Sequence, residues 1–351
     1  KAVSFSHRQI VLHTLSTATK LAMQKPYGMG FGDVYMPITP MFHGHAWGMP
    51  YAATLMGLKQ VYPGRYEPAM LLALHRAEGV TFSHCVPTIL QMLLDLVDAE
   101  GGDLTGWSMA IGGSALTRKL LERAAAHGMR VFAGYGLSEA GPNLTLSRPR
   151  IRDEGGSNDE MLCAAGVPFP LAAFRLIDGE GKLQPHDGVS EGELQVRAPW
   201  LTLGYSGNAE ASAALWEGGW MHTQDVAAIT PDGYVLIRDR LKDIIKSGGE
   251  WVSSLQLEDM LLTVPGIREI AVIGVPDERW GERPVAFVVP AEGADVTVDA
   301  IRAALEGPIA EGSLSKFAIP DRVVTVAELP RTSVGKIDKK RLRVLASPAG
   351  A

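Results

Sequence analysis

Strands and helices alternate from residue 34 to about residue 135, and this alternation constrains the fold more than any other feature of the chain. Short apolar runs typical of strands lie at 34–38, 60–62, 80–85, 108–111 and 130–132. Apolar residues at helical spacing separate the later runs, at 68–76, 87–97 and 116–127. Because parallel strands are joined by crossover helices, this order predicts a layered α/β body around a mainly parallel sheet.

The pattern changes after residue 166, where strands follow one another without helices between them. We expect strands at 174–177, 192–197, 225–230 and 233–238, with turns at Asp178-Gly179 and Asp232-Gly233. The stretch before them, 141–160, is polar, and we expect it to be irregular and its residues 154–160 to be mobile. These features predict a β-rich subdomain attached to the α/β body.

A smaller unit begins after residue 248. Ser253 followed three residues later by Gln256 is typical of a helix capping box, and this helix should run to about Thr263. Further strands are expected at 269–275, 285–289 and 322–326, and further helices at 298–305 and 339–345. The mixture predicts a small α+β C-terminal domain.

The segment between these regions, 238–251, reads Arg-Asp-Arg-Leu-Lys-Asp-Ile-Ile-Lys-Ser-Gly-Gly-Glu-Trp. Paired glycines permit backbone conformations that other residues rarely adopt, and Lys242 and Lys246 are too polar for a core. A solvated interdomain loop and a hinge that presents cations to a ligand both fit these residues. The expected division is a partial N-terminal domain, 1–240, a hinge, 241–248, and a mobile C-terminal lid domain, 249–346.

The composition excludes several classes of protein. A formal net charge of −6 argues against a broad basic face and hence against a nucleic-acid partner. The two cysteines, Cys85 and Cys163, are too few for a disulfide framework or a four-cysteine zinc site, so a reducing, cytoplasmic location is expected. No apolar run reaches the length of a membrane span.

Two glycine-containing segments follow predicted strands, where open α/β sheets bind their ligands. The first segment is Gly134-Tyr135-Gly136-Leu137-Ser138-Glu139. In it, the Tyr135 ring could stack on a flat base, and Gly136 would let the backbone come close to a ligand. Glu139 could bind a hard divalent cation. Gly112-Gly113-Ser114 could contact a planar group in the same way. Ordinary strand-to-helix turns with a surface glutamate fit each segment equally well when it is taken alone.

Other candidates are more isolated in the sequence. The carboxylate of Asp225 suits ribose hydroxyls, although a turn or cap role also fits it. Lys336, in a polar loop after a glycine, suits phosphate oxygens, although a solvated surface lysine is the plainer interpretation. His43, His45 and Trp47 cluster after the first strand, and because a third metal ligand is missing nearby, an aromatic pocket wall or gate is favoured over a metal site.

Taken together and in this order, the motifs resemble those of the adenylate-forming superfamily, which includes acyl-CoA synthetases, adenylation domains of peptide synthetases and luciferases. The resemblance covers nearly the whole chain. Residues 248–254 and 40–47 are similar to those of the medium- and long-chain fatty-acyl-CoA synthetase branch. Members of the family that act on other small carboxylic acids share these two segments. The resemblance implies a role in fatty acid metabolism, with ATP and CoA as co-substrates, Mg²⁺ as the metal and a small-molecule carboxylic acid as the substrate. Members of this branch often form homodimers, so a homodimer is also expected.

The resemblance also implies a role for each matching residue. The nucleotide-binding set is Gly112, Gly113, Ser114, Tyr135, Gly136, Ser138, Asp225 and Arg240, with Tyr135 on adenine and Asp225 and Arg240 on the ribose. The implied catalytic residues are Glu139, which would hold Mg²⁺, and Lys336 and Lys246. Lys242 matches the hinge, Trp47 and His43 the acyl gate, and Gly248, Gly249 and Trp251 the face that meets CoA.

The chemistry implied by the resemblance has two steps. A carboxylate attacks the α-phosphorus of ATP to give an acyl-adenylate and pyrophosphate, with Lys336 neutralising charge. After the C-terminal domain rotates about Lys242, the CoA thiol attacks the acyl carbon and AMP leaves. A fatty-acyl-AMP ligase that serves a carrier protein, or a non-catalytic relative, are the alternatives; the short link from Leu241 to Gly248 favours the synthetase.

The sequence departs from the family pattern in two places. Of the family's phosphate loop only a remnant, Lys1-Ala2-Val3, stands at the first residue, and we therefore expect this chain to be part of a longer protein whose mass exceeds 37.6 kDa. Gln224 stands where the family more often has glycine. The length of the acyl chain cannot be read from these motifs.

Overall fold

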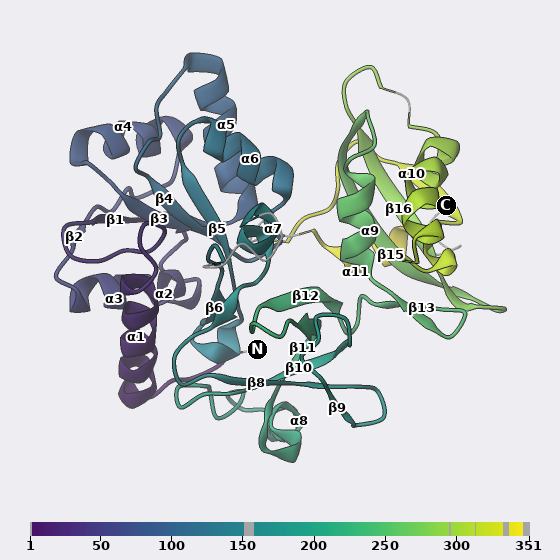
Figure 1. Cartoon of the computed structure of the whole chain (residues 1–351), viewed down its shortest axis with the longest axis horizontal. Coiled ribbons are helices and arrows are strands. Elements are labelled where there is room, and N and C mark those ends of the chain that lie inside the picture. Colours follow the sequence, from purple (N-terminus) through teal and green to yellow (C-terminus); the bar gives the residue numbers. More distant parts are fainter. Residues whose placement is uncertain (1, 151–157, 295, 313, 333–336, 347–351) are drawn as a thin grey trace. The chain divides into compact units, whose positions relative to one another are not determined.

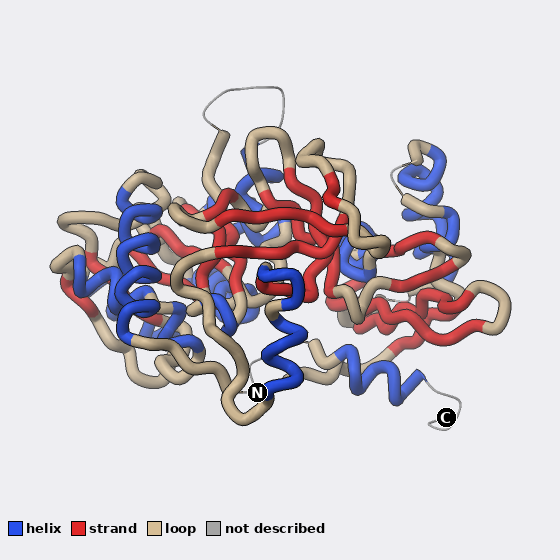
Figure 2. The backbone as a smooth tube through the Cα atoms, turned by 90° about the horizontal axis from the view of Figure 1, so that it is seen from below, coloured by secondary structure: helices blue, strands red, loops and turns tan. Residues whose placement is uncertain are grey.

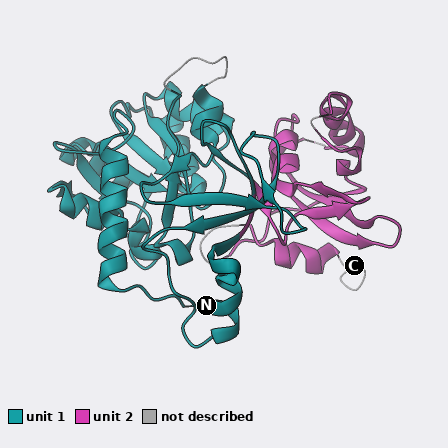
Figure 3. Cartoon of the chain, turned by 60° about the horizontal axis from the view of Figure 1, so that its bottom comes forward, with its two compact units in different colours: residues 1–223, 227–237 teal, residues 224–226, 238–351 magenta. Residues whose placement is uncertain are grey.

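The computed structural model describes residues 2–150, 158–294, 296–312, 314–332 and 337–346. By its internal contacts the chain divides into two compact units, which Figure 3 distinguishes by colour. The first comprises residues 1–223 and 227–237, and the second comprises residues 224–226 and 238–351.

A seven-stranded sheet of order β2-β1-β3-β4-β5-β6-β7 forms the centre of the first unit. The strands β2, β1, β3, β4 and β5 pair in parallel, as the alternation of strands and helices predicted, and β6 and β7 continue the sheet antiparallel. Their bounds are β1 (Val34–Pro37), β2 (Lys59–Gln60), β3 (Phe82–Cys85), β4 (Ser108–Ile111), β5 (Arg130–Gly136), β6 (Asn143–Leu146) and β7 (Val167–Pro168).

Helices cover both faces of this sheet. Figure 1 shows α4, α5 and α6 on one face and α1, α2 and α3 on the other. Their bounds are α1 (His7–Ala22), α2 (Gly44–Trp47), α3 (Met49–Leu55), α4 (Pro68–Glu78), α5 (Pro87–Glu100) and α6 (Arg118–Ala126), and α7 (Asn158–Cys163) follows β6. The prediction of an irregular stretch at 141–160 was wrong, because β6 and the start of α7 lie within it.

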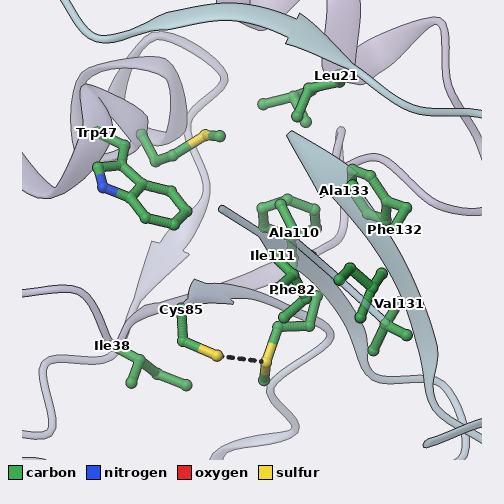
Figure 4. Close-up of a cluster of buried hydrophobic side chains, with 14 of the residues drawn as sticks. Leu21, Ile38, Trp47, Phe82, Cys85, Ala110, Ile111, Val131, Phe132 and Ala133 are labelled. Atoms are coloured by element: carbon green, nitrogen blue, oxygen red, sulfur yellow. Dashed lines mark hydrogen bonds between the residues drawn. The ribbon is translucent and has the colours of Figure 1, made fainter. Parts of the chain in front are cut away.

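The main hydrophobic core lies around this sheet. Figure 4 draws part of it, in which Phe82, Ile111 and Phe132 from β3, β4 and β5 meet Leu21 from α1. The thiol of Cys85 lies 3.3 Å from the sulfur of Met109, and burial raises the pKa of this thiol. A buried thiol of this kind is a packing residue, since only an accessible thiolate reacts readily.

The β-rich subdomain is a five-stranded sheet of order β12-β11-β10-β8-β9. Its strands are β8 (Ala173–Ile177), β9 (Leu183–Gln184), β10 (Gly192–Arg197), β11 (Met221–Ile229) and β12 (Val235–Arg240), and α8 (Ala209–Leu215) lies between β10 and β11. Strand β8 pairs antiparallel with both β10 and β9, and Figure 2 colours these strands red. Short 3-10 helices follow β5, as η1 (Ser138–Ala140), and α8, as η2 (Glu217–Gly219).

The second unit has its own sheet of order β14-β13-β16-β15, with β17 parallel to β16. The strands are β13 (Ile245–Ser247), β14 (Glu250–Val252), β15 (Ile267–Asp277), β16 (Gly281–Pro290) and β17 (Arg322–Thr325). The helices are α9 (Ser254–Leu261), α10 (Val298–Ala310), η3 (Lys316–Ala318) and α11 (Lys339–Ala346). Ser253 caps α9 as predicted, its side chain accepting from the Gln256 N–H.

The second half of the predicted hinge, residues 245–248, begins a hairpin. Residues Ile245 and Val252, Lys246 and Trp251, and Ser247 and Glu250 are paired across β13 and β14. Gly248 and Gly249 form the turn with φ of 62° and 83°, the left-handed pair that a two-residue hairpin turn needs. The paired glycines therefore form a tight turn between β13 and β14, and the hinge role of Lys242 stays a prediction.

Candidate functional site

The predicted site residues of the first unit gather at the carboxyl edge of the parallel strands. The order β2-β1-β3-β4-β5 reverses direction between β1 and β3, and open α/β sheets bind ligands at such a point. Trp47 and Gly112 follow β1 and β4, and Tyr135 lies at the carboxyl end of β5, so the topology brings these distant residues to one edge. In the sheet β4 and β5 are neighbours, and β3 lies between β1 and β4 (Figure 1).

Trp47 lies in an unusual left-handed turn. Residues 44–48 all have positive φ, between 49° and 68°, and only the first and last of them are glycines. Each non-glycine residue in this conformation costs about 1–2 kcal/mol, and such strain is concentrated at functional sites in proteins. The turn directs the indole of Trp47 inward, where only 7% of the residue is exposed.

His84 and Asn143 hold Trp47 in place. The Trp47 and His84 rings have centroids 5.0 Å apart, and the Asn143 side-chain amide donates to the Trp47 carbonyl at 2.6 Å. Thr39 donates its hydroxyl hydrogen to the His84 carbonyl, which leaves the Thr39 oxygen to accept from His84 Nδ1. The remaining nitrogen, Nε2, then accepts from the Tyr35 hydroxyl at 2.7 Å. Burial lowers the pKa of His84 to about 3, so its imidazole is neutral at physiological pH.

Gly112 packs directly against this tryptophan. A Cβ at residue 112 would lie 3.0 Å from Trp47 Cη2 and 3.2 Å from the Gly134 carbonyl oxygen. The planar group against this glycine is therefore the protein's own indole. The next two residues, Gly113 and Ser114, are exposed, and they remain available to a ligand.

Tyr135 and Gly136 are the last residues of β5, whereas the sequence had suggested a loop for both. A Cβ on Gly136 would lie 1.8 Å from the Pro142 carbonyl oxygen, so this glycine admits the protein's own backbone instead of a ligand. The expectation for Gly136 is corrected in that respect. The Tyr135 side chain is partly buried, and His43 after β1 is also partly buried.

Ser138 and Glu139 lie in η1, immediately after β5. Ser138 is exposed, and Glu139 is half-buried beside Tyr205, whose hydroxyl donates to Glu139 Oε1 at 2.6 Å. Burial and the adjacent carboxylate raise the pKa of Tyr205, so this hydroxyl stays a donor. Within the described part of the chain, Glu139 Oε2 makes no hydrogen bond. One fixed and one available oxygen fit a Mg²⁺ ion, which is commonly bound by one or two carboxylates together with phosphates and water.

Asp225 and Arg240 belong to the second unit and are paired with each other. Arg240 Nε lies 2.6 Å from Asp225 Oδ1, and the Asp225 side chain is only 3% exposed. Asp225 was expected at the first position of a strand, 225–230, but it lies inside β11, which begins at Met221. The preceding residue, Gln224, has φ of 61°, a conformation that glycine adopts at lower cost.

The hairpin of the second unit carries several predicted residues. Lys246 and Trp251 are directly opposite each other, so both side chains lie on one face of the hairpin, and both are exposed. A Cβ on Gly248 would lie 2.5 Å from the ring of Phe317. Both this contact and the positive φ of the residue therefore disfavour any other side chain at this position. Lys242, the predicted hinge, is exposed just before the hairpin.

Lys336 lies outside the described residues, and its predicted role stays a prediction. Tyr205 and His84 were missed by sequence reasoning. Tyr205 lies 66 positions after the carboxylate that it contacts, and His84 is an isolated histidine within an apolar strand. No spacing signal could have found either of them.

The described residues contain no group of three or more histidine, cysteine, aspartate or glutamate side chains arranged to hold a metal ion. None of their helices combines the length and the apolar character that crossing a membrane requires.

Comparisons with known proteins show the family to which the chain belongs. Residues 1–206 match the family described as AMP-binding enzyme, and residues 256–336 match the AMP-binding enzyme C-terminal domain. The chain is 42% identical over 349 residues to a long-chain-fatty-acid–CoA ligase of Thermus thermophilus, covering 98% of this chain and 63% of that protein. It is 37% identical over 353 residues to a 3-methylmercaptopropionyl-CoA ligase of Ruegeria lacuscaerulensis, with coverages of 98% and 63%.

Solved structures give the same result for the fold. The amide bond synthetase McbA from Marinactinospora thermotolerans matches with a TM-score of 0.84 at 28% identity, over 98% of this chain and 67% of that one. The chain thus spans 63% of the length of both of the curated relatives described above.

Proposed function

Because the chain belongs to the AMP-binding enzyme family, we propose that the protein containing it is an ATP-dependent acyl-CoA synthetase acting on a fatty or related carboxylic acid. The observation that carries the proposal is the gathering of Trp47, Gly112, Tyr135 and Glu139 at the carboxyl edge of one parallel sheet. The similarity to two acid–CoA ligases supports the same reaction class.

In the first proposed step, a carboxylate oxygen attacks the α-phosphorus of ATP and pyrophosphate leaves. Tyr135 and the exposed Gly113-Ser114 would contact the adenine, Ser138 a phosphate, and Asp225 and Arg240 the ribose. Lys336 would neutralise charge that develops between the carboxylate and the α-phosphate. Glu139, oriented by Tyr205, would hold Mg²⁺, which supplies further charge neutralisation when bound.

In the second proposed step, the CoA thiolate attacks the acyl carbon and AMP leaves. The shared face of Lys246 and Trp251 would meet CoA, with the Gly248-Gly249 turn at its end. Lys242 would be the pivot that exchanges this face for Lys336 between the two steps. Trp47, fixed by His84, would be the gate between the nucleotide and the acyl group, and His43 would line it.

Pyrophosphate release by the full-length protein tests the proposal. A panel of acids from propionate to palmitate is supplied with ATP and Mg²⁺, with and without CoA. CoA-dependent turnover with AMP formation is expected. Adenylate that accumulates and is not transferred to CoA would instead favour a fatty-acyl-AMP ligase that serves a carrier protein, and no pyrophosphate with any acid would favour a non-catalytic binding protein.

We also propose a cytoplasmic homodimer as the working form. Size-exclusion chromatography with light scattering measures the mass directly, and a monomeric mass at micromolar concentration would overturn this part of the proposal.

A further inference from the structure

A row of buried polar side chains runs along helix α1 on the face that meets strand β6. His13, Thr17 and Lys20 recur at intervals of four and three residues, which places them on one side of the helix, and Gln24 follows in the turn after α1. All four residues are at most 9% exposed. A polar row of this kind is unusual on the buried side of an amphipathic helix, where apolar residues are expected.

Both ends of this row are bonded to β6 and the residue that follows it. His13 Nε2 accepts from the Asn143 N–H at 3.3 Å, and the Gln24 side-chain amide donates to the Ser147 carbonyl. Asn143 also holds the carbonyl of Trp47, the proposed acyl gate. The row therefore starts at the gate and leads away from it.

Lys20 is the unusual member of the row. It is 8% exposed, and among the described residues no carboxylate pairs with it. A second cation, Arg148, lies directly after Ser147, and its charge acts on Lys20. Burial and the Arg148 charge lower the pKa of Lys20 to about 8, which leaves it mostly protonated at neutral pH. Two neighbouring cations with little water around them are costly unless an anion accompanies them.

Several polar atoms around these cations also lack partners. Thr17 Oγ1, Gln24 Oε1 and Arg148 Nε are buried and make no hydrogen bond. Buried polar atoms are normally satisfied, and a group of them in one place indicates a missing ligand or water. A lysine ammonium has three donors, so it can serve the Gln24 oxygen and an anion together.

We propose that Lys20 and Arg148 bind a second carboxylate, at the far end of the acid substrate, and that the enzyme accepts dicarboxylic acids. This rests on the proposed synthetase function. Along the helix axis, Lys20 lies about 10 Å beyond His13, from the rise per residue of an α-helix. An acyl chain that passes Trp47 and follows α1 would bring its distal carboxylate to the two cations, and each cation would donate to one carboxylate oxygen.

The test compares two acid series on the full-length protein. Adipic, suberic and sebacic acids are measured against hexanoic, octanoic and decanoic acids by pyrophosphate release. Lys20→Met and Arg148→Met should each lower kcat/KM for the best diacid roughly 10- to 100-fold. The same variants should leave the monoacids unchanged or improved. Lys20→Arg should retain diacid activity, and Lys182→Met, at an exposed lysine, is the matched control.

Calorimetric titration of the diacids into wild type and Lys20→Met gives a readout that does not need turnover. If the protein activates monoacids but neither turns over nor binds diacids, the inference is overturned and the proposed synthetase function is unaffected. Equal losses for both series would assign Lys20 a purely structural role and overturn it too. If no acid is activated, the proposed function falls, and diacid binding that is lost in Lys20→Met would still support the carboxylate site.

Discussion

Replacing Gly112 by alanine tests whether the indole of Trp47 is packed against the glycine at the end of β4. The added Cβ would lie 3.0 Å from Trp47 Cη2 and 3.2 Å from the Gly134 carbonyl oxygen. Neither neighbour can move easily, because Trp47 is buried against His84 and Gly134 is part of β5. Overpacking of this kind costs about 1–3 kcal/mol, and we expect the free energy of unfolding to fall by that amount.

Trp47→Phe supplies the background in which this cost should largely disappear. Phenylalanine lacks Cη2 and Cζ3, the two indole atoms nearest to the added methyl group. In that background Gly112→Ala should cost less than about 1 kcal/mol, because only the Gly134 carbonyl remains close. The coupling free energy of the cycle should therefore be about 1–2 kcal/mol.

Urea unfolding of the four proteins measures the cycle. Gly30→Ala is the control, because a Cβ on Gly30 meets only Lys25 Cε, at an ordinary contact distance of 3.6 Å, and should change the free energy of unfolding by less than about 1 kcal/mol. If Gly112→Ala costs the same with and without the indole, Trp47 does not pack where the structure has it. The assignment of Trp47 as a gate over the β4 loop would then lose its basis.

Four further predictions concern other parts of the molecule. Tyr205→Phe removes the hydrogen bond that orients the carboxylate of η1, and adenylation should slow at least about tenfold with a higher Mg²⁺ requirement, whereas an unchanged Mg²⁺ titration would contradict the orienting role. Burial lowers the pKa of His13 to about 4 and that of His84 to about 3. Both histidines are therefore neutral in the folded protein at a pH where the unfolded chain, with a pKa of 6.5, takes up protons, and stability is lost as pH falls from 6.5 toward 4. Each of the two histidines should lower the free energy of unfolding by about 2 kcal/mol between about pH 6.5 and 5. Urea unfolding that gives the same free energy at about pH 7 and 5 would refute this. Gly248→Ala should destabilise the second unit by about 2–4 kcal/mol through its φ of 62° and the ring below it, as thermal unfolding would report, and a wild-type melting temperature would show that the hairpin turn tolerates a side chain. Lys336→Ala should slow adenylation roughly 10²- to 10³-fold, yet supplied acyl-adenylate should still form thioester, and an equal loss in both half-reactions would argue against its assigned role.

The parallel sheet could be predicted because its strands are buried on both faces. A strand such as Ser108–Ile111 is buried along its whole length, and its short apolar run was recognisable without any partner. Helix α1 could not be recognised from periodicity, because its buried residues include His13, Thr17 and Lys20 beside only two apolar ones, Ala18 and Leu21. Its capping box from Ser6 to Gln9 was a usable signal that went unnoticed.

The candidate site was predictable only where its residues follow strands directly. Gly112 and Tyr135 were found because each stands at a strand end in the sequence. The contacts that hold the site together join residues far apart in the chain, such as Glu139 with Tyr205, and no local pattern encodes them. The glycines at 136 and 248 were assigned to ligands and to a linker, because sequence alone does not reveal which atoms approach a glycine.

The assignment of residues 224–226 to the second unit has a practical consequence for anyone who wishes to exchange lobes between related enzymes. The polypeptide enters that unit once within β11, returns for residues 227–237, and enters it again at Arg238. A chimera joined at a single crossover between residues 226 and 239 would thus take Asp225 from one parent and Arg240 from the other. Exchanges that keep this acid–base pair from one source need a junction before residue 224 or after residue 240.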